Sequence, residues 1–280
     1  MTPFTYTLII LAVSIAAGLL GSLLGLGGGI IITPVLTLFL GVPIKYAIGA
    51  TIISVIATSS GAAATYVKEH MTNLRLAILL SVATTAGALT GGYLNGLFDQ
   101  RWLFIIFGII LGYSALMMFH SHRKDSPSIP PPSDPFADKL HLHGHYFDHI
   151  EQRDIHYRIA RTPLGLFLMY IAGVVSGLLG IGSGALKVPA LDLAMRLPFK
   201  VSTATSNFMM GITAAASAGL FFARGRINPL IAAPVSVGVL CGAVLGAKLL
   251  PKIHSKTVRI VFIAVLLLIS GQMIYKGIYS

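Results

Sequence analysis

Three lysines and a set of small polar side chains occur beside two glycine-rich stretches of an otherwise apolar chain. Ammonium groups, hydroxyls and amides can bind a small oxyanion through hydrogen bonds. A buried lysine needs a countercharge, which a bound anion would supply. Alternatively, Lys45 and Lys200 extend to lipid headgroups, and single Ser or Thr hydroxyls bond to their own helix. The candidate anion-binding residues are Lys45, Lys187, Lys200, Thr51, Thr205, Ser206 and Asn207.

Acidic residues are few, and only one of the nine falls within an apolar stretch. This residue, Asp192, has Thr37 at the equivalent position of the first half. A charge at membrane depth is costly and is normally functional or paired. Asp192 is therefore the candidate proton-coupling residue, with pairing to Lys187 or a place near the interface as the alternative. Because so few carboxylates lie at membrane depth, the sequence favours an anion over a cation as the substrate.

The two glycine-rich stretches are copies, since residues 23–45 recur at 178–200 without a gap. Clustered glycines disfavour a continuous helix, because each costs about 1 kcal/mol relative to alanine. Unwound backbone at membrane depth must be buried in protein or line a cavity, and interrupted segments in two halves indicate a transporter's substrate site. The predicted substrate-facing residues are Gly25, Gly27, Gly28 and Gly29, and their counterparts Gly180, Gly182, Ser183 and Gly184.

The candidate residues lie within or beside long apolar runs, which predict an all-α polytopic membrane protein. We expect about eight transmembrane helices, arranged in two homologous four-helix repeats. Each repeat begins with a glycine-broken helix, followed by a half-helix that ends near Gly41 or Arg196. We divide the chain into repeat 1 (1–120), a polar Pro/His-rich linker (121–161) and repeat 2 (162–280). The expected spans are 4–32, 47–67, 74–97, 102–120, 163–190, 202–223, 228–250 and 257–278.

Composition excludes several classes of function. The chain is 55% hydrophobic and 10% charged, against about 25% charged residues in soluble domains. Its net charge of +11 lies mostly between apolar runs, which indicates membrane topology and not a nucleic-acid partner. One cysteine, Cys241, excludes an internal disulfide. With no Walker motif, H-E-x-x-H, G-x-S-x-G or paired carboxylates, we expect neither ATPase nor enzyme activity, and no cofactor.

The linker contains most of the histidines, and its sequence is compatible with a small β-hairpin. His141 and His143 would share one face of a strand and could hold zinc, but no second ligand cluster supports a metal site. Linker orientation and repeat orientation both remain open. Four crossings per half give parallel repeats, whereas a half-helix that counts as a fifth crossing gives inverted ones.

One long motif carries a family resemblance. Residues 173–207 read GVVSGLLGIGSGALKVPALDLAMRLPFKVSTATSN, with a weaker copy at 18–51. Together they resemble the sulfite exporter TauE/SafE family, also called TSUP, over nearly the whole chain. The resemblance implies a bacterial or archaeal inner-membrane permease for sulfite, sulfonates or related anions. Ser183 replaces a third glycine of the family pattern, and Gly49-Ala50-Thr51 replaces small-Thr-Ser.

We therefore expect a multi-pass secondary transporter for a small anion, a sulfur oxyanion or organosulfonate such as sulfite. Its site would lie between the two glycine breaks, with membrane lipid around it and a proton or sodium ion as the coupling ion. The alternatives are a passive channel for the same anions and a metal-cation carrier regulated by the histidine-rich linker. The sequence leaves open the direction of transport and whether the chain forms a homodimer.

Overall fold

The computed structural model describes residues 3–94, 100–120, 134–179 and 183–279. Six of its helices are long and apolar enough to cross a membrane, and they correspond to α1, α3, α4, α9, α10 and α11, with the span at α10 extending to Lys252. Two shorter apolar helices, 104–120 and 162–178, lie within α5 and α7. The long helices are α1 (Pro3–Leu24), α3 (Ile44–Lys68), α4 (Leu74–Leu94), α5 (Gln100–His120), α7 (Thr162–Leu179), α9 (Phe199–Ala223), α10 (Pro229–Leu249) and α11 (Ser255–Tyr279).

A short helix follows each break, as the glycine pattern predicts. In the first half, α2 (Gly29–Pro34) runs into a π-helical turn, η1 (Val35–Phe39). In the second half, α8 (Gly184–Pro189) runs into the π-helical turn η2 (Ala190–Ala194). The half-helices thus end within two residues of Gly41 and Arg196, where the sequence predicts their ends.

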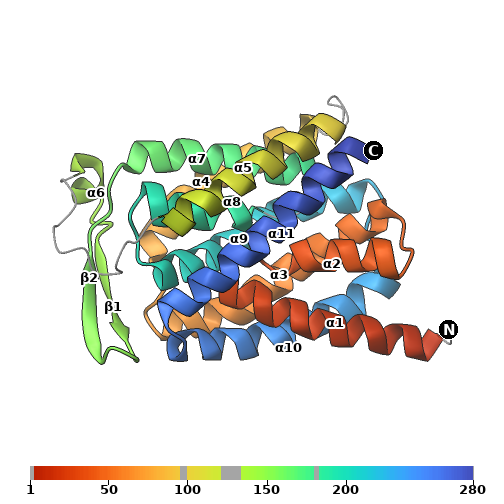
Figure 1. The fold of residues 1–280 in the computed structure, drawn as a ribbon, viewed down its shortest axis with the longest axis horizontal. Coiled ribbons are helices and arrows are strands. Elements are labelled where there is room, and N and C mark those ends of the chain that lie inside the picture. Colours follow the sequence, from red (N-terminus) through yellow and green to blue (C-terminus); the bar gives the residue numbers. More distant parts are fainter. Residues whose placement is uncertain (1–2, 95–99, 121–133, 180–182, 280) are drawn as a thin grey trace.

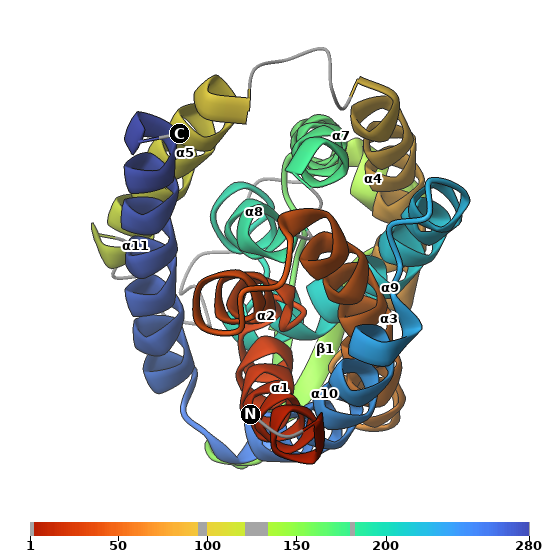
Figure 2. The ribbon, with the colours of Figure 1, turned by 90° about the vertical axis from the view of Figure 1, so that its right-hand side faces the viewer.

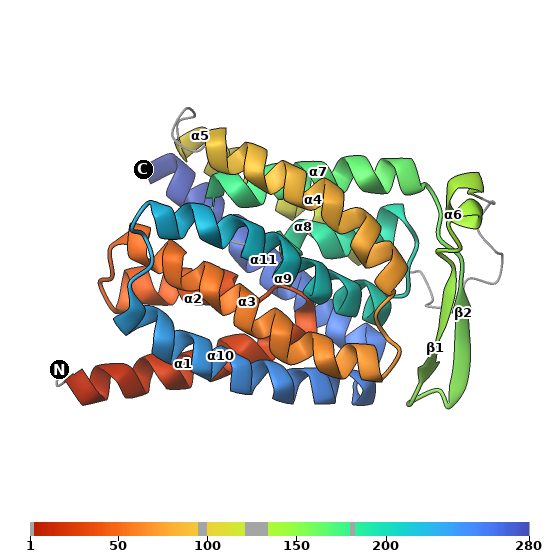
Figure 3. The same ribbon diagram turned by 180° about the vertical axis from the view of Figure 1, so that it is seen from behind.

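The first long helices of the two halves, α1 and α7, run in opposite directions along the bundle. Both termini lie at one end, and the linker hairpin lies at the other (Figures 1 and 3). Helix α1 runs from the end that holds the termini toward the hairpin, and α7 runs away from the hairpin. Figure 2, viewed from the N-terminal end, shows α2 and α8 among the longer helices.

Helices from different halves pack in reciprocal pairs. Helix α1 packs along α10 and α4 packs along α7, while α5 packs on α11 and α3 on α9. Glycines permit this close approach. A Cβ atom on Gly91 of α4 would lie 2.1 Å from the carbonyl oxygen of Val174 in α7. One on Gly242 of α10 would lie 2.0 Å from the carbonyl oxygen of Ile15 in α1.

The described part of the linker folds against one end of the bundle. It comprises α6 (Pro135–Lys139) and an antiparallel hairpin of β1 (Gly144–Asp148) and β2 (Arg153–Tyr157). Tyr146 and Ile155 of the hairpin are buried in the hydrophobic core. The predicted hairpin is therefore present. The strand prediction for the histidine pair is wrong, because His141 and His143 precede β1, and His141 lies in a turn with φ of 49°.

Candidate functional site

The two halves meet at their glycine-rich segments. Gly25, Gly27 and Gly28 all have positive φ angles, which favour glycine, so the chain turns sharply between α1 and α2. Gly184, the first residue of α8, lies against this turn. A Cβ atom on Gly184 would be 2.3 Å from the carbonyl oxygen of Gly25. The first break and the start of the second half-helix are thus in backbone contact. Gly180 and Gly182 lie outside the described residues.

Polar side chains of α9 bind the freed backbone of the first break. Ser206 Oγ donates to the carbonyl oxygen of Gly25 (3.1 Å), and Asn207 Nδ2 donates to that of Ser22 (2.7 Å). Ser59 Oγ of α3 in turn donates to the carbonyl oxygen of Asn207 (2.6 Å). The bonds to Gly25 and Ser22 satisfy carbonyl groups at the break, which an unbroken helix would pair internally. Ser206 and Asn207 therefore hold the break in place.

The two predicted threonines have separate positions. Thr51 Oγ1 of α3 lies 2.6 Å from Thr33 Oγ1 of α2, and this bond fixes the first half-helix against α3. Thr205 Oγ1 accepts a hydrogen bond from the backbone N–H of Asn73 (3.2 Å), which precedes α4 near the hairpin. Thr51 is thus beside the break, whereas Thr205 lies toward the hairpin end of α9.

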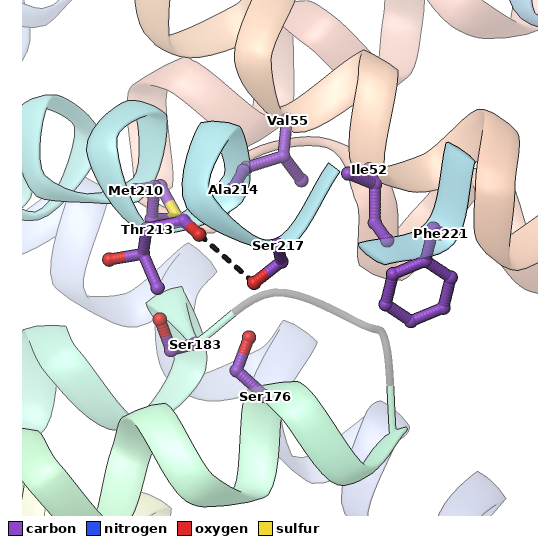
Figure 4. A pocket seen from close by; sticks show the side chains of 9 residues that line it. All are labelled: Ile52, Val55, Ser176, Ser183, Met210, Thr213, Ala214, Ser217 and Phe221. Atoms are coloured by element: carbon purple, nitrogen blue, oxygen red, sulfur yellow. Dashed lines mark hydrogen bonds between the residues drawn. The ribbon is translucent and has the colours of Figure 1, made fainter. Parts of the chain in front are cut away.

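A small hydroxyl-lined cavity lies beside the second break. Its polar side chains are Ser176 of α7, Ser183, and Thr213 and Ser217 of α9, and apolar residues of α3 and α9 complete the lining (Figure 4). The Ser176 and Ser183 hydroxyls point toward the α9 face that carries Thr213 and Ser217. The cavity volume is about 20 Å³, which is room for one or two water molecules. A sulfur oxyanion would need the cavity to widen.

Lys187 is completely buried, and its partner Thr213 lines this cavity. Its Nζ donates to Thr213 Oγ1 at 3.1 Å, and that hydroxyl is 3.1 Å from Thr84 Oγ1 of α4. A lysine ammonium has three protons to donate. Among the residues that the structure describes, no other acceptor and no carboxylate contacts Lys187 Nζ. Within the described residues, the Lys187 ammonium thus has no carboxylate as countercharge.

Two of the other predicted charged residues, Lys200 and Asp192, are paired elsewhere. Lys200 Nζ lies 3.0 Å from Asp148 Oδ2 of the hairpin, and both side chains are buried. Burial alone would raise the pKa of Asp148, but hydrogen bonds from the Ile150 N–H and Lys200 outweigh it and lower that pKa. Asp192 pairs with Arg259 of α11 (2.9 Å), and not with Lys187. Lys45 lies in the first turn of α3, and its side chain lies outside the described part.

Several hydroxyls near the breaks are buried without a hydrogen-bond partner among the described residues. They include Ser183 Oγ, which lines the cavity, Thr58 Oγ1 and Thr203 Oγ1. Buried polar groups in native proteins normally have partners, so such atoms call for a ligand or water. Thr58 Oγ1 lies close to Gly28, where a Cβ atom would be 3.3 Å away. Unpaired hydroxyls thus accompany both breaks.

Ser176 and Ser217 are absent from the sequence-derived site, although both line the cavity. Their equivalents in the first half are Gly21 and Ala62, so the repeat carries no polar signal at these positions. Within the described residues, no group of three His, Cys, Asp or Glu side chains is placed to hold a metal ion.

Apolar helices of membrane-spanning length, two half-helices that meet, and a small cavity with four hydroxyl side chains are typical of a multi-pass membrane protein of the transporter class. The chain belongs to the sulfite exporter TauE/SafE family, whose model matches residues 10–273. It is 30% identical to the probable membrane transporter protein YunE of Bacillus subtilis, over 97% of this chain and 98% of that protein. A probable membrane transporter protein of Methanocaldococcus jannaschii is 26% identical, over 92% and 91% of the two chains. No solved structure matches significantly.

Proposed function

We propose that this protein is a secondary transporter for a small anion, a sulfur oxyanion or organosulfonate of the sulfite type, in the bacterial or archaeal inner membrane. One observation carries the proposal. The buried Lys187 ammonium has a single hydroxyl acceptor among the described residues, and this acceptor, Thr213, lines a cavity that three further hydroxyl side chains also line. A buried cation without a countercharge is costly, and a bound anion removes that cost.

The arrangement of the helices supports a transport cycle around this site. We propose that the chain is an inverted repeat of two four-helix halves, since α1 and α7 run in opposite directions and α1–α10 mirrors α7–α4. In inverted-repeat transporters, substrate binds near the repeat interface and the halves rock around it. In this proposal, the contact between Gly25 and Gly184 lies at that interface, and the small cavity is the binding site in a contracted state; the close backbone contact and the small volume support this.

Asp192 is the candidate proton-coupling residue in this scheme. Its carboxylate accepts a hydrogen bond from Arg259, so protonation would weaken a link between η2 and α11. Asp192→Asn is expected to abolish accumulation driven by a pH gradient while leaving counterflow exchange of anion. Asp154→Asn, at an exposed position of β2, is the matched control. Loss of both activities in Asp192→Asn would assign the residue to structure or binding.

The proposal is tested with purified protein in liposomes, by measuring uptake of labelled sulfite under an imposed pH gradient. Accumulation above the external concentration identifies secondary transport, whereas simple equilibration identifies the passive channel. Lys187→Met should eliminate uptake, while Lys248→Met, an exposed lysine of α10, should leave it unchanged. Wild-type protein that moves none of sulfite, sulfonate or sulfate in either direction would refute the proposed function.

A further inference from the structure

Charged side chains buried in the described part of the chain form an almost complete set of pairs. The buried members are Asp134, Asp148, Lys187, Asp192 and Lys200, each at most 8% exposed, whereas the side chain of Arg259 is 13% exposed. Two acids have basic partners, because Asp148 pairs with Lys200 and Asp192 pairs with Arg259. A third acid, Asp134, lies in the linker and accepts hydrogen bonds from three backbone N–H groups, those of Phe136, Ala137 and Thr162.

Lys187 remains as one buried positive charge, and its Nζ binds the hydroxyl of Thr213, which lines the cavity. Ser183 Oγ lines the same cavity and has no partner among the described residues. Hydroxyls donate or accept hydrogen bonds but add no charge to the site. The described surroundings of the cavity thus present a net charge of one, together with neutral hydrogen-bonding groups.

We infer that the site selects its substrate by charge and takes a monoanion with a compact oxyanion head, such as a sulfonate or hydrogensulfite. This inference rests on the proposed function. A monoanion neutralises Lys187, whereas a dianion such as sulfate leaves one uncompensated negative charge in a low-dielectric interior. A neutral ligand of the same shape leaves Lys187 itself unpaired. Uncompensated buried charge is among the largest penalties in a protein interior.

The test compares three ligands with a tetrahedral sulfur centre and different charges, titrated into the purified full-length chain by calorimetry. Methanesulfonate carries one negative charge, sulfate carries two, and dimethyl sulfone carries none. We expect methanesulfonate to bind at least about tenfold more tightly than sulfate, and dimethyl sulfone to show no binding. Because this comparison uses the wild-type protein, it holds whether or not any variant folds.

Lys187→Met and the matched control Lys248→Met test whether the charge of Lys187 is responsible for anion binding. Lys187→Met should lose methanesulfonate binding, and Lys248→Met should bind as the wild type does. Sulfate binding as tightly as methanesulfonate would overturn the monoanion inference but leave anion transport standing. Unchanged methanesulfonate binding in folded Lys187→Met would overturn the role of this lysine. If the wild-type protein binds neither anion, the proposed function falls together with the inference.

Discussion

Lys200 and Asp148 form a buried ion pair, with 3.0 Å between Nζ and Oδ2, that joins the start of α9 to the linker hairpin. Lys200 Nζ also lies 3.5 Å from the carbonyl oxygen of Pro251, in the short turn that follows α10. The linker is therefore part of the folded bundle, at least in its described residues. Asn73 strengthens the same junction, because its Nδ2 donates to the carbonyl oxygen of Leu142 (2.7 Å).

Removing one partner of this pair should destabilise the protein more than removing both. Asp148→Asn or Lys200→Met leaves an uncompensated or poorly paired buried group, at a cost of about 3–5 kcal/mol. The double variant should recover part of that loss, and a double-mutant cycle on thermal unfolding in detergent measures the coupling. Lys252→Met, an exposed lysine near the same end, is the control and should change little. Additive effects of the two substitutions would show that the pair contributes no coupling.

The lowered pKa of Asp148 predicts a loss of stability at acid pH. Because the folded-state pKa lies below the unfolded value of about 3.9, the unfolded chain takes up the proton more readily. The stabilisation is complete above pH 3.9 and is lost as the pH falls through the folded-state pKa. Asp134 has a lowered pKa as well, so the relevant measurement is the difference between wild-type and Asp148→Asn unfolding curves from pH 6 to 3. A constant difference would contradict the prediction.

Structural features that depend on neighbouring residues in the chain, such as helix breaks, could be predicted from the sequence. Repeated glycines give the break and the half-helix after it, because backbone freedom and helix propensity are local properties. The glycine at position 28 has φ of 66°, as a break requires, but its equivalent Ser183 has φ of −95°. The second break therefore has a different local conformation, which the copied sequence did not indicate.

Tertiary contacts of individual side chains could not be predicted from the local sequence pattern. Lys200 matches Lys45 in a repeated Pro-x-Lys, which makes it resemble a site residue. It pairs instead with Asp148, a residue of the linker that has no counterpart in the repeat. The same limit applies to Ser176 and Ser217, which meet at the cavity only because α7 and α9 pack around it. Tertiary contacts between distant segments decide these assignments.

Ser183→Ala should weaken anion binding without destabilising the fold. Its hydroxyl is buried, lines the cavity and has no partner among the described residues, so its removal breaks no described hydrogen bond. A hydrogen bond to a charged group contributes about 1.5–3 kcal/mol, which corresponds to a loss of about tenfold or more in affinity. Methanesulfonate titration and thermal unfolding of the same preparation check both parts.

Ser202→Ala is the matched control for this prediction. Ser202 Oγ is also buried without a described partner, but the residue does not line the cavity. Its substitution should leave anion affinity unchanged. Equal affinity in wild-type and Ser183→Ala protein would place the anion away from this hydroxyl. A large loss of stability in Ser183→Ala would instead make the hydroxyl a structural group.

Gly184→Ala should abolish transport, because an added methyl group cannot fit between the two breaks. Its Cβ atom would lie 2.3 Å from the carbonyl oxygen of Gly25 and 2.8 Å from Cα of Leu26. Both are backbone atoms, so a rotamer change cannot relieve the clash, and the half-helix must move away from the first break. Since Ser206 bonds to the same Gly25 carbonyl, this displacement should also disturb the contact with α9.

Gly271→Ala in α11 provides the control, because a Cβ atom there meets nothing within 4 Å. Alanine favours the helix by about 1 kcal/mol over glycine, so this variant should be as stable as the wild type or more stable, with normal uptake. Both variants are measured for membrane insertion, thermal unfolding and sulfite uptake in liposomes. Insertion should persist in Gly184→Ala, since alanine is compatible with a membrane helix. Normal uptake in that variant would mean that the two breaks separate freely, and their contact would then play no part in the transport cycle.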